Sequence, residues 1–378
     1  MLNSAAKLNN FAADGTETLT LNLFNDLSLP IIIERIEKSG NHKSITGVVS
    51  GREDSDITLT FGNGIMVGNI NLTSGAYQIR PTQNGGHEIL EINYAVLPNE
   101  HKPEFPDLQP VSSVQDSILP LATNSSTVDI MVVYTSSSRV KVGGTNAVNA
   151  LIKTAVAETN TSYTKSKISQ KLRLVHTVEV IYKEKTGDTF WKALTHITST
   201  SDGKMDRIHK LRNKYGADEV ILVIDDYDYC GMAWIMQNAS SGFAGYAFGI
   251  VGINCLSGGS SFSHELGHNM GAAHDAYVNG DGVYNYSKGF VHLDSKSITI
   301  MAYHNKCSNA GVYCYRRNLW SGTNVYYNGA RLGKLGARNN TTLNNTRTTV
   351  AEFKATKINK PGKPVGISPD GGQLTLNP

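Results

Sequence analysis

One stretch in the second half of the chain decides both its fold and its chemistry, namely residues 263–275 with the sequence SHELGHNMGAAHD. In a helix, residues four apart lie on one face, so His264 and His268 can present two imidazoles to one metal ion. Glu265 follows the first histidine directly, where its carboxylate can reach a water molecule on that ion. The spacing therefore predicts a metal-binding helix with a carboxylate beside the metal.

A glycine and a third histidine extend the pattern past this helix. Gly271 can adopt a positive φ without a Cβ clash, so it can end the helix and turn the chain. The turn would return His274 as a third ligand. Three histidines leave one tetrahedral position open for water, which is typical of a catalytic zinc site rather than a structural one. We therefore predict Zn²⁺ at His264, His268 and His274, with Glu265 as the general base.

The composition around this stretch is that of a soluble globular protein. The chain has 378 residues, of which 40% are hydrophobic and 18% charged. No apolar run approaches the length of a membrane helix, and no motif for nucleic-acid binding occurs, so we expect neither a membrane span nor a nucleic-acid partner. Residues 1–13 lack the apolar stretch of a signal peptide. Either the protein stays inside the cell, or an export signal has been trimmed from this chain.

Charge and proline content divide the chain into an acidic front and a basic rear. Residues 1–120 carry 7 Lys and Arg against 14 Asp and Glu, whereas residues 121–378 carry 28 against 18, so the two parts should attract each other. Five of the 11 prolines fall within 98–120 and none within 121–360, which indicates a linker before a compact domain. The predicted units are a front domain over 1–110, a linker over 111–125, a second domain over 126–356 and a tail over 357–378.

Hydrophobic patterning predicts different structures for the two domains. The front domain has short strand-like stretches separated by Gly and Asn turns, which predicts a small antiparallel β-sheet; they are 44–50, 56–61, 65–72, 77–80 and 87–94. The second domain alternates strands with helices, which predicts an α/β sheet. Its expected strands are 128–134, 172–182, 219–224 and 244–253, and its expected helices are 146–163, 205–215 and 341–353. We expect the Gly-rich strand 244–253 at an edge of the sheet.

All four cysteines lie in the basic rear of the chain. Their spacings fit neither a zinc ribbon nor a CxxC redox site. They indicate either two disulfides, Cys307–Cys314 as a short loop and Cys230–Cys255 as the remaining pair, or four reduced core thiols. Two disulfides would favour an oxidising compartment and therefore secretion.

The histidine pattern resembles the HExxHxxGxxH signature of metzincin zinc metalloproteases, and Asp275 after the third histidine is similar to the adamalysin, or reprolysin, branch. Residues 300–303, IMAY, resemble the Met-turn beneath the zinc of these enzymes, with Met301 as its floor. The resemblance implies a metzincin catalytic domain with a twisted mixed sheet and an active-site helix. Tyr303 occupies the place where other metzincin branches hold a tyrosine near zinc. It could be a fifth ligand, an oxyanion donor or a packing residue.

Further segments resemble bacterial peptidyl-Asp metallopeptidases of the Asp-N type. These segments are 133–135, 155–160, 172–180, 202–209, 228–231 and 299–303. Residues 1–110 resemble the propeptides of such enzymes. The resemblance implies a secreted zinc endopeptidase that acts on proteins or peptides and is made as a zymogen. An inhibitory propeptide in cis and an activation cleavage within 111–125 are then expected.

The segment after the Met-turn walls the S1′ pocket of metzincins, and here it contains Arg316 and Arg317. Two arginines in that wall would pair with an acidic P1′ side chain, which predicts cleavage on the amino side of Asp. The alternative is a pair of solvated surface arginines. We expect the substrate to add a strand along the edge formed by 244–253.

The acidic front domain contains no cysteine, so it cannot block a zinc ion with a thiolate. A carboxylate, a histidine or a backbone group would have to do so, and the candidates in the Pro-rich stretch are His101, Glu104 and Asp107.

Two alternatives remain at this point. Residues 279–282, NGDG, could bind Ca²⁺, but no twelve-residue ligand pattern follows them, so a hairpin turn is favoured. The chain could also be a non-catalytic zinc-binding or adhesion module on a metzincin scaffold. Such a module would have no need for Glu265.

Overall fold

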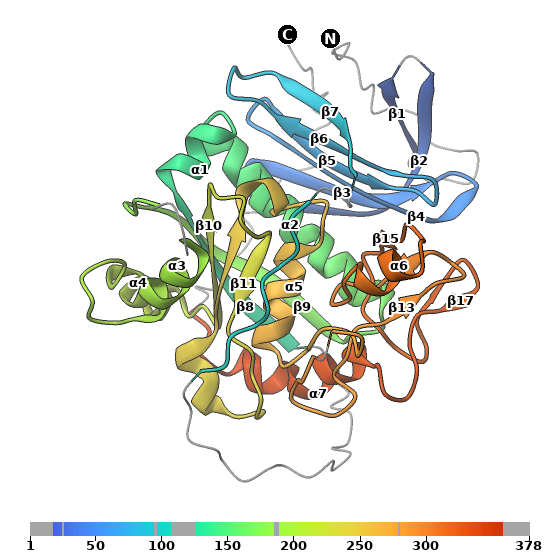
Figure 1. The fold of residues 1–378 in the computed structure, drawn as a ribbon. Helices are drawn as coiled ribbons and strands as arrows, with labels where there is room; N and C mark the ends of the chain where they lie inside the picture. The colour runs from blue at the N-terminus through green and yellow to red at the C-terminus, as the bar shows by residue number, and fades with distance from the viewer. Residues whose placement is uncertain are drawn as a thin grey trace, which may run out of the picture.

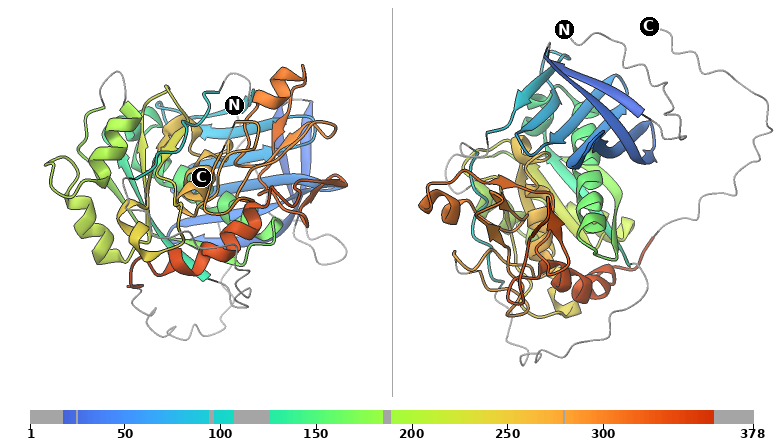
Figure 2. Two further views of the ribbon diagram at one scale, coloured as in Figure 1. Left: turned by 60° about the horizontal axis from the view of Figure 1, so that its bottom comes forward. Right: turned by 90° about the vertical axis from the view of Figure 1, so that its right-hand side faces the viewer.

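Two β-sheets with the long helix α2 (Thr145–Lys165) between them form the framework of the protein (Figure 1). The computed structural model describes residues 18–24, 26–93, 97–106, 126–184, 189–278 and 280–357. The predicted linker 111–125 and all but the first residue of the predicted tail lie outside these residues. Figure 2 shows the first sheet lying across one side of α2.

The first sheet contains seven strands, each antiparallel to its neighbours in the sequence. They are β1 (Thr18–Phe24), β2 (Leu27–Ser39), β3 (His42–Val49), β4 (Arg52–Gly62), β5 (Ile65–Asn71), β6 (Ala76–Pro81) and β7 (His87–Glu91). Alternate side chains such as Ile45, Ile57 and Ile79 are buried in its core. The expected antiparallel front sheet is therefore confirmed, with β1 and β2 as two strands that the sequence pattern did not predict.

The main sheet contains five strands in the order β11-β12-β10-β8-β9. They are β8 (Ser126–Thr135), β9 (Gln170–Val180), β10 (Glu219–Ile224), β11 (Gly231–Ala233) and β12 (Phe248–Gly252). All neighbours pair in parallel except β11, which runs antiparallel to β12. The α/β fold class is confirmed. The expected edge position of 244–253 is wrong, because the three-residue strand β11 covers β12 and takes the edge itself.

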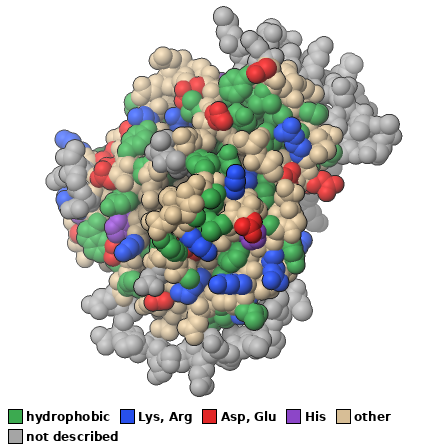
Figure 3. All heavy atoms as spheres, turned by 45° about the vertical axis from the view of Figure 1, so that its right-hand side comes forward, with side chains coloured by type: hydrophobic (Ala, Val, Ile, Leu, Met, Phe, Trp, Pro, Cys, Tyr) green, Lys and Arg blue, Asp and Glu red, His purple; other side chains and the backbone are tan. Residues whose placement is uncertain are grey.

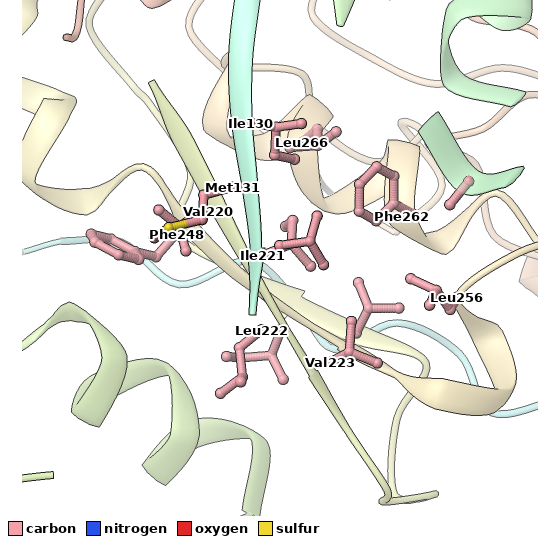
Figure 4. Close-up of a cluster of buried hydrophobic side chains, with 14 of the residues drawn as sticks. Ile130, Met131, Val220, Ile221, Leu222, Val223, Phe248, Leu256, Phe262 and Leu266 are labelled. Atoms are coloured by element: carbon pink, nitrogen blue, oxygen red, sulfur yellow. The ribbon is translucent and has the colours of Figure 1, made fainter. Parts of the chain in front are cut away.

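The core of the main sheet packs against α5 (Ser261–Asn269), and Figure 4 shows apolar side chains from β8, β10, β12 and α5 meeting there. Strands β8 and β10 are buried on both faces, which explains their nearly continuous apolar sequences. The other helices are α1 (Ser136–Lys141), α3 (Thr189–Thr198), α4 (Arg207–Tyr215) and α7 (Asn339–Ala351), with 3-10 turns η1 (Ser241–Tyr246) and η2 (Ile253–Cys255).

The chain between α5 and α7 is mostly irregular. Its short elements are β13 (Val291–His292), β14 (Ser297–Ile298), α6 (Asn305–Asn309), β15 (Tyr315–Arg316), β16 (Tyr326–Tyr327) and β17 (Ala330–Arg331). Disulfides Cys230–Cys255 and Cys307–Cys314 join cysteines whose Cα atoms lie 5.3 and 6.1 Å apart. Both predicted pairings are therefore confirmed, and all four cysteines are paired.

The front sheet is joined to the rest of the protein by polar contacts. Asp56 of β4 accepts from Lys165 at 2.8 Å and from Asn318 at 3.0 Å. Gln78 of β6 donates to the Ser257 carbonyl at 3.0 Å. Opposite charges meet across this interface in the ion pairs Lys165–Asp56 and Lys171–Glu37. On the outer surface, Figure 3 shows Lys and Arg side chains gathering on the lower part of the face in view.

Glu158 of α2 is buried beneath the front sheet, where it accepts from the Gly258 amide at 3.2 Å. Burial, reinforced by the charge of Asp56, raises the pKa of Glu158 from 4.5 to about 8. Between these two pH values the folded state holds a proton that the unfolded state has lost. The free energy of unfolding therefore falls as the pH rises through this window.

We expect Glu158→Gln to remove this loss of stability, because glutamine stays neutral and keeps an oxygen acceptor for Gly258. Urea unfolding should show the wild type losing roughly 2 to 4 kcal/mol relative to the variant between about pH 5 and pH 8. Glu352→Gln, at an exposed position, should follow the wild type. Parallel pH profiles for the wild type and Glu158→Gln would contradict the expectation.

Candidate active site

The helix that carries the first two histidines is α5, which is buried along its whole length. It ends at Asn269, Met270 caps it, and Gly271 follows with φ of +86°. A Cβ atom at Gly271 would come within 2.7 Å of the Val283 side chain and 3.0 Å of the Met236 carbonyl oxygen. A residue without a Cβ is therefore required where the chain turns back toward the helix.

This turn brings the three histidines together. The Nε2 atom of His274 lies 2.9 Å from Nε2 of His264 and 3.1 Å from Nε2 of His268. All three imidazoles are buried, and among the described residues they form a group that could hold a metal ion. Two adjacent turns of α5 and the loop that follows it thus contribute the three nitrogen atoms of this group.

Hydrogen bonds fix which ring nitrogen of each helical histidine faces the centre. His264 Nδ1 donates to the Ile300 carbonyl and His268 Nδ1 donates to the Ala272 carbonyl, each at 2.9 Å. The Nε2 lone pairs of His264 and His268 therefore face the centre, where Nε2 of His274 also lies. Burial lowers the pKa of His264 to about 4 and those of His268 and His274 well below the usual value. Three neutral, converging imidazole nitrogens fit Zn²⁺.

Glu265 is fully buried, and neither of its carboxylate oxygens has a hydrogen-bond partner among the described residues. A Cβ atom at Gly231 of β11 would collide with Glu265 Oε1, so the carboxylate lies against the edge strand. Burial, followed by the charge of Glu100, raises the pKa of Glu265 well above its usual value. A cation on the neighbouring imidazoles would favour the ionised carboxylate. An unpartnered carboxylate at this position is suited to bind a water molecule or a substrate.

Met301 lies beneath α5 and is fully buried. A Cβ atom at Gly267 would come within 2.9 Å of the Met301 sulfur and 2.7 Å of the Trp320 ring. The same turn presents the Ile300 carbonyl to His264. Asp275 accepts from the Tyr303 amide at 2.9 Å and so ties the turn to the third histidine. Residues 300–303 therefore support the histidine centre from below.

The Tyr303 ring packs over His274, with ring centroids 4.1 Å apart. Its hydroxyl donates to the Glu100 carbonyl oxygen at 2.6 Å and lies 3.3 Å from the His101 carbonyl oxygen. The hydroxyl thus contacts the backbone of residues 100 and 101, which come before β8 in the sequence. Burial raises the pKa of Tyr303 above its usual value, so the hydroxyl keeps its proton.

Residues 97–106, hereafter the strap, run beside β11 across the histidine centre, and Figure 1 shows them in teal in front of α5. The Cys230 amide donates to the Asn99 carbonyl at 3.1 Å, and the His101 amide donates to the Gly231 carbonyl at 2.8 Å. Further along, Glu104 pairs in parallel with Trp234. The strap thus extends the sheet at its edge.

Glu100 of the strap forms a buried ion pair with Arg316 of β15. Arg316 Nη1 donates to Glu100 Oε1, and Nη2 donates to Oε2 at 3.0 Å. Ser261 Oγ, at the start of α5, also donates to Oε1 at 2.8 Å. Burial alone would raise the pKa of Glu100, but the charge of Arg316 outweighs it and holds that pKa well below its usual range. The carboxylate is therefore ionised and fully partnered.

The other predicted residues of the strap and of the pocket lie elsewhere. His101 Nδ1 donates to the Lys102 carbonyl at 2.7 Å and lies 3.5 Å from Glu104, outside the histidine group. Asp107 lies outside the described residues. Arg317 donates to the Leu72 carbonyl at 3.0 Å and stacks on Tyr327 at 4.1 Å. Of the two arginines, the structure brings only Arg316 to the site.

Part of the predicted calcium loop packs against the backbone of the third histidine, because a Cβ atom at Gly280 would come within 2.6 Å of the His274 amide nitrogen. Asn279 is outside the described residues, and the Lys288 ammonium lies 3.4 Å from Asp281 and donates to the Gly280 carbonyl. Two oxygen atoms of this loop thus contact the Lys288 ammonium.

Sequence reasoning did not single out Glu100, Ser261 and Gly231. Glu100 stands one residue before the candidate His101, and nothing local separates it from Glu104. Ser261 and Gly231 are common residue types whose role depends on what the fold places beside them. The only available signal was the acidic character of the strap together with the arginines after the Met-turn.

The fold and the site define a metal-dependent hydrolase, in which a buried three-histidine centre lies beside an unpartnered carboxylate at the edge of an α/β sheet. Residues 124–327 match the family described as Metallo-peptidase family M12B Reprolysin-like, and the chain belongs to this family of metallopeptidases. It is an enzyme that acts on proteins or peptides, and the family implies zinc as its metal. The resemblance to reprolysin-like metalloproteases is confirmed.

Two relatives at about one-third sequence identity support the same family. A peptidyl-Asp metalloendopeptidase of Xanthomonas campestris pv. campestris is 33% identical over 295 residues, covering 76% of this chain and 67% of that protein. Another from Stenotrophomonas maltophilia (strain R551-3) is 32% identical over 328 residues, covering 84% and 75%. A solved structure of a chaperone–substrate complex aligns with a TM-score of 0.48 at 19% identity, covering 76% of this chain and 39% of that chain.

None of the helices in the described part of the chain has both the length and the apolar character needed to cross a bilayer.

Proposed function

We propose that this chain is the zymogen of a secreted, zinc-dependent endopeptidase that cleaves on the amino side of Asp. The observation that carries the enzymatic part is the buried centre of His264, His268 and His274 with the unpartnered carboxylate of Glu265 beside it. A purely structural metal site would not need a buried carboxylate without partners, which is costly to maintain.

The proposed roles follow from where the side chains lie. The three histidines would hold the zinc ion, which lowers the pKa of a bound water molecule and polarises the scissile carbonyl. Glu265 would accept the proton of the attacking water and pass it to the leaving amine. Tyr303 keeps its proton and packs over His274, so its hydroxyl would donate to the oxyanion that develops on the substrate.

Recognition of an acidic side chain would rest on Arg316. Its guanidinium is held by the Gly259 carbonyl at 3.2 Å and the Ala302 carbonyl at 3.3 Å. Neither carbonyl belongs to the strap, so the guanidinium of Arg316 is oriented before a substrate binds. A planar, fixed guanidinium favours bidentate pairing with a carboxylate. The names of the relatives, peptidyl-Asp metalloendopeptidases, agree with an aspartate as that group.

The substrate backbone would bind along β11, the edge strand beside Glu265. The strap forms backbone hydrogen bonds with residues of this edge, which supports its capacity to accept an added strand. An internal segment of a protein can bind in this way without a free terminus, which agrees with endopeptidase action.

The zymogen proposal assigns residues 1–110 to an inhibitory propeptide and 126–356 to the catalytic domain, with an activation cleavage within 111–125. The strap that crosses the site supports the inhibitory role. The sequence around the linker contains Asp107 and Asp116, so the proposed specificity would permit self-cleavage. The two disulfides support secretion into an oxidising compartment.

The function is tested by digesting a denatured protein and sequencing the products by mass spectrometry, after activation at a site-specific protease sequence inserted within 111–125. We expect about one zinc per chain, cuts before Asp, and loss of activity with a chelator. His268→Ala should lose zinc and activity, whereas His292→Ala, outside the histidine group, should keep both. Zinc-free but active enzyme, or cuts unrelated to Asp, would contradict the corresponding part of the proposal.

A further inference from the structure

We infer that the strap keeps the enzyme latent by placing Glu100 in the pocket that reads the acidic side chain of the substrate, and that Ser261 is the second recognition residue of this pocket. The inference rests on the proposed function and deepens it. It assigns latency to the specificity pocket, whereas the sequence suggested a residue of the strap that would block the metal.

The first step is the geometry of the pocket. Arg316 and Ser261 come from β15 and from the first residue of α5, and both donate to the same oxygen, Glu100 Oε1. Arg316 Nη2 reaches the second oxygen at 3.0 Å. The Glu100 and Arg316 side chains are only 1% and 7% exposed. A carboxylate that is bound at both oxygens and removed from water matches what a pocket for an acidic side chain must provide.

The second step is the backbone on either side of Glu100. The amide of Cys230 donates to the carbonyl of Asn99, and the amide of His101 donates to the carbonyl of Gly231. Gly231 is the residue against which the Glu265 carboxylate lies. The strap therefore uses the edge of the sheet that faces Glu265, and a substrate cannot use it at the same time.

The third step is the Tyr303 hydroxyl, which donates to the carbonyl of Glu100 at 2.6 Å. A single residue of the strap thus occupies the arginine pocket with its side chain and the tyrosine hydroxyl with its backbone. This double use explains how a strap without cysteine could prevent turnover.

The remaining strap side chains do not offer such a contact. Glu104 and His101 are each 30% exposed and lie beside each other, and the His101 ring also packs edge-on against Tyr229. Removing one partner of a buried ion pair leaves a charge without compensation, which is far more costly than losing an exposed one. Glu100 is therefore the residue of the strap on which latency should depend.

The strap pairs in parallel with the chain that follows β11, so its backbone direction is fixed relative to Glu265. A substrate that entered antiparallel to β11 would present its peptide bond to the histidine centre in the opposite direction. The strap would then hold an acidic side chain in the pocket while its backbone runs in the direction opposite to that of such a substrate.

The test compares uncut full-length chains, with mass spectrometry confirming that they stay uncut during the assay. Cleavage of an internally quenched Asp peptide should be at least about tenfold faster for Glu100→Gln than for the wild type. Glu100→Asp, which keeps the charge, should stay largely latent. Glu104→Gln, a matched change at an exposed strap carboxylate, should behave as the wild type. Equal latency of Glu100→Gln and the wild type would overturn the inference.

A second measurement does not depend on how the variants fold. A synthetic peptide of residues 97–106 should inhibit the activated wild-type enzyme, and the same peptide with Gln at position 100 should inhibit at least about tenfold less well. Equal inhibition by the two peptides would also overturn the inference. If the activated wild-type enzyme cleaves no peptide, the proposed function fails instead, so the two failures are distinguishable.

The role of Ser261 is tested in the activated enzyme with two peptides that differ only in Asp or Asn at P1′. Ser261→Ala should lower kcat/KM for the Asp peptide by about tenfold, because a hydrogen bond to a charged group is lost. The loss should be much smaller for the Asn peptide. Equal losses on both peptides would show a structural effect at the start of α5 and would contradict the assignment of Ser261 to the pocket.

Discussion

Glu265→Gln is expected to lower kcat of the activated enzyme by about 10²- to 10⁴-fold, which is the range for loss of a general acid–base group. Glutamine has nearly the same shape, but it cannot accept the proton of the attacking water. The carboxylate has no hydrogen-bond partner among the described residues, so the substitution removes no contact within the protein. KM and zinc content should change little, and both are measured by steady-state kinetics and metal analysis of the same preparation.

Glu219→Gln is the matched control for this experiment. Glu219 of β10 is also fully buried, and both of its carboxylate oxygens lack a partner among the described residues. It does not belong to the group around the histidines. We therefore expect Glu219→Gln to keep kcat within about twofold of the wild type, since Glu219 lies outside the proposed catalytic group and transfers no proton in the reaction. A similar loss of kcat in both variants would show that any buried carboxylate matters and would contradict a specific role for Glu265.

Arg316→Ala is expected to abolish the preference for Asp at P1′. A buried charge pair that loses one partner typically costs about 2 to 5 kcal/mol, so kcat/KM for an Asp peptide should fall by about 30- to 5,000-fold. The Asn peptide should lose much less, because a neutral amide does not need the guanidinium as a counter-charge. The measurement is the ratio of kcat/KM for the two peptides, made on the activated enzyme.

Arg317→Ala provides the control for Arg316. The Arg317 guanidinium stacks on Tyr327 and donates to Leu72 of the front sheet. Its removal should therefore lower the stability of the uncut chain and leave the Asp-to-Asn ratio unchanged. A preserved ratio in Arg316→Ala, or a collapsed ratio in Arg317→Ala, would remove Arg316 from its proposed role.

The histidine centre could be predicted from the sequence because its chemistry is local. His264, His268 and His274 lie within eleven consecutive residues. Helix periodicity aligns the first two, and Gly271 provides the turn that returns the third. Few other conformations are available to this stretch, so the spacing was enough to anticipate the geometry that the structure shows.

Pairing between distant segments could not be predicted in the same way. Strand β11 has only three residues, too few for a periodic signal, and its place at the edge overturned the position expected for 244–253. Both Arg316 and Arg317 were predicted to bind the acidic P1′ side chain. Successive side chains of an extended chain, however, point to opposite sides. One therefore faces the strap and the other faces Tyr327.

The sequence by itself determined the metal-binding helix, the turn after it and the α/β class, whereas the structure decided that the four cysteines form two disulfides. Only the tertiary structure decided which acidic group meets Arg316. Glu100 is 216 residues away from that arginine, and their contact depends on the path of the strap along β11. The physical reason is that helix and turn geometry act between near neighbours, whereas a buried ion pair forms only where the packing of remote segments excludes water from both groups.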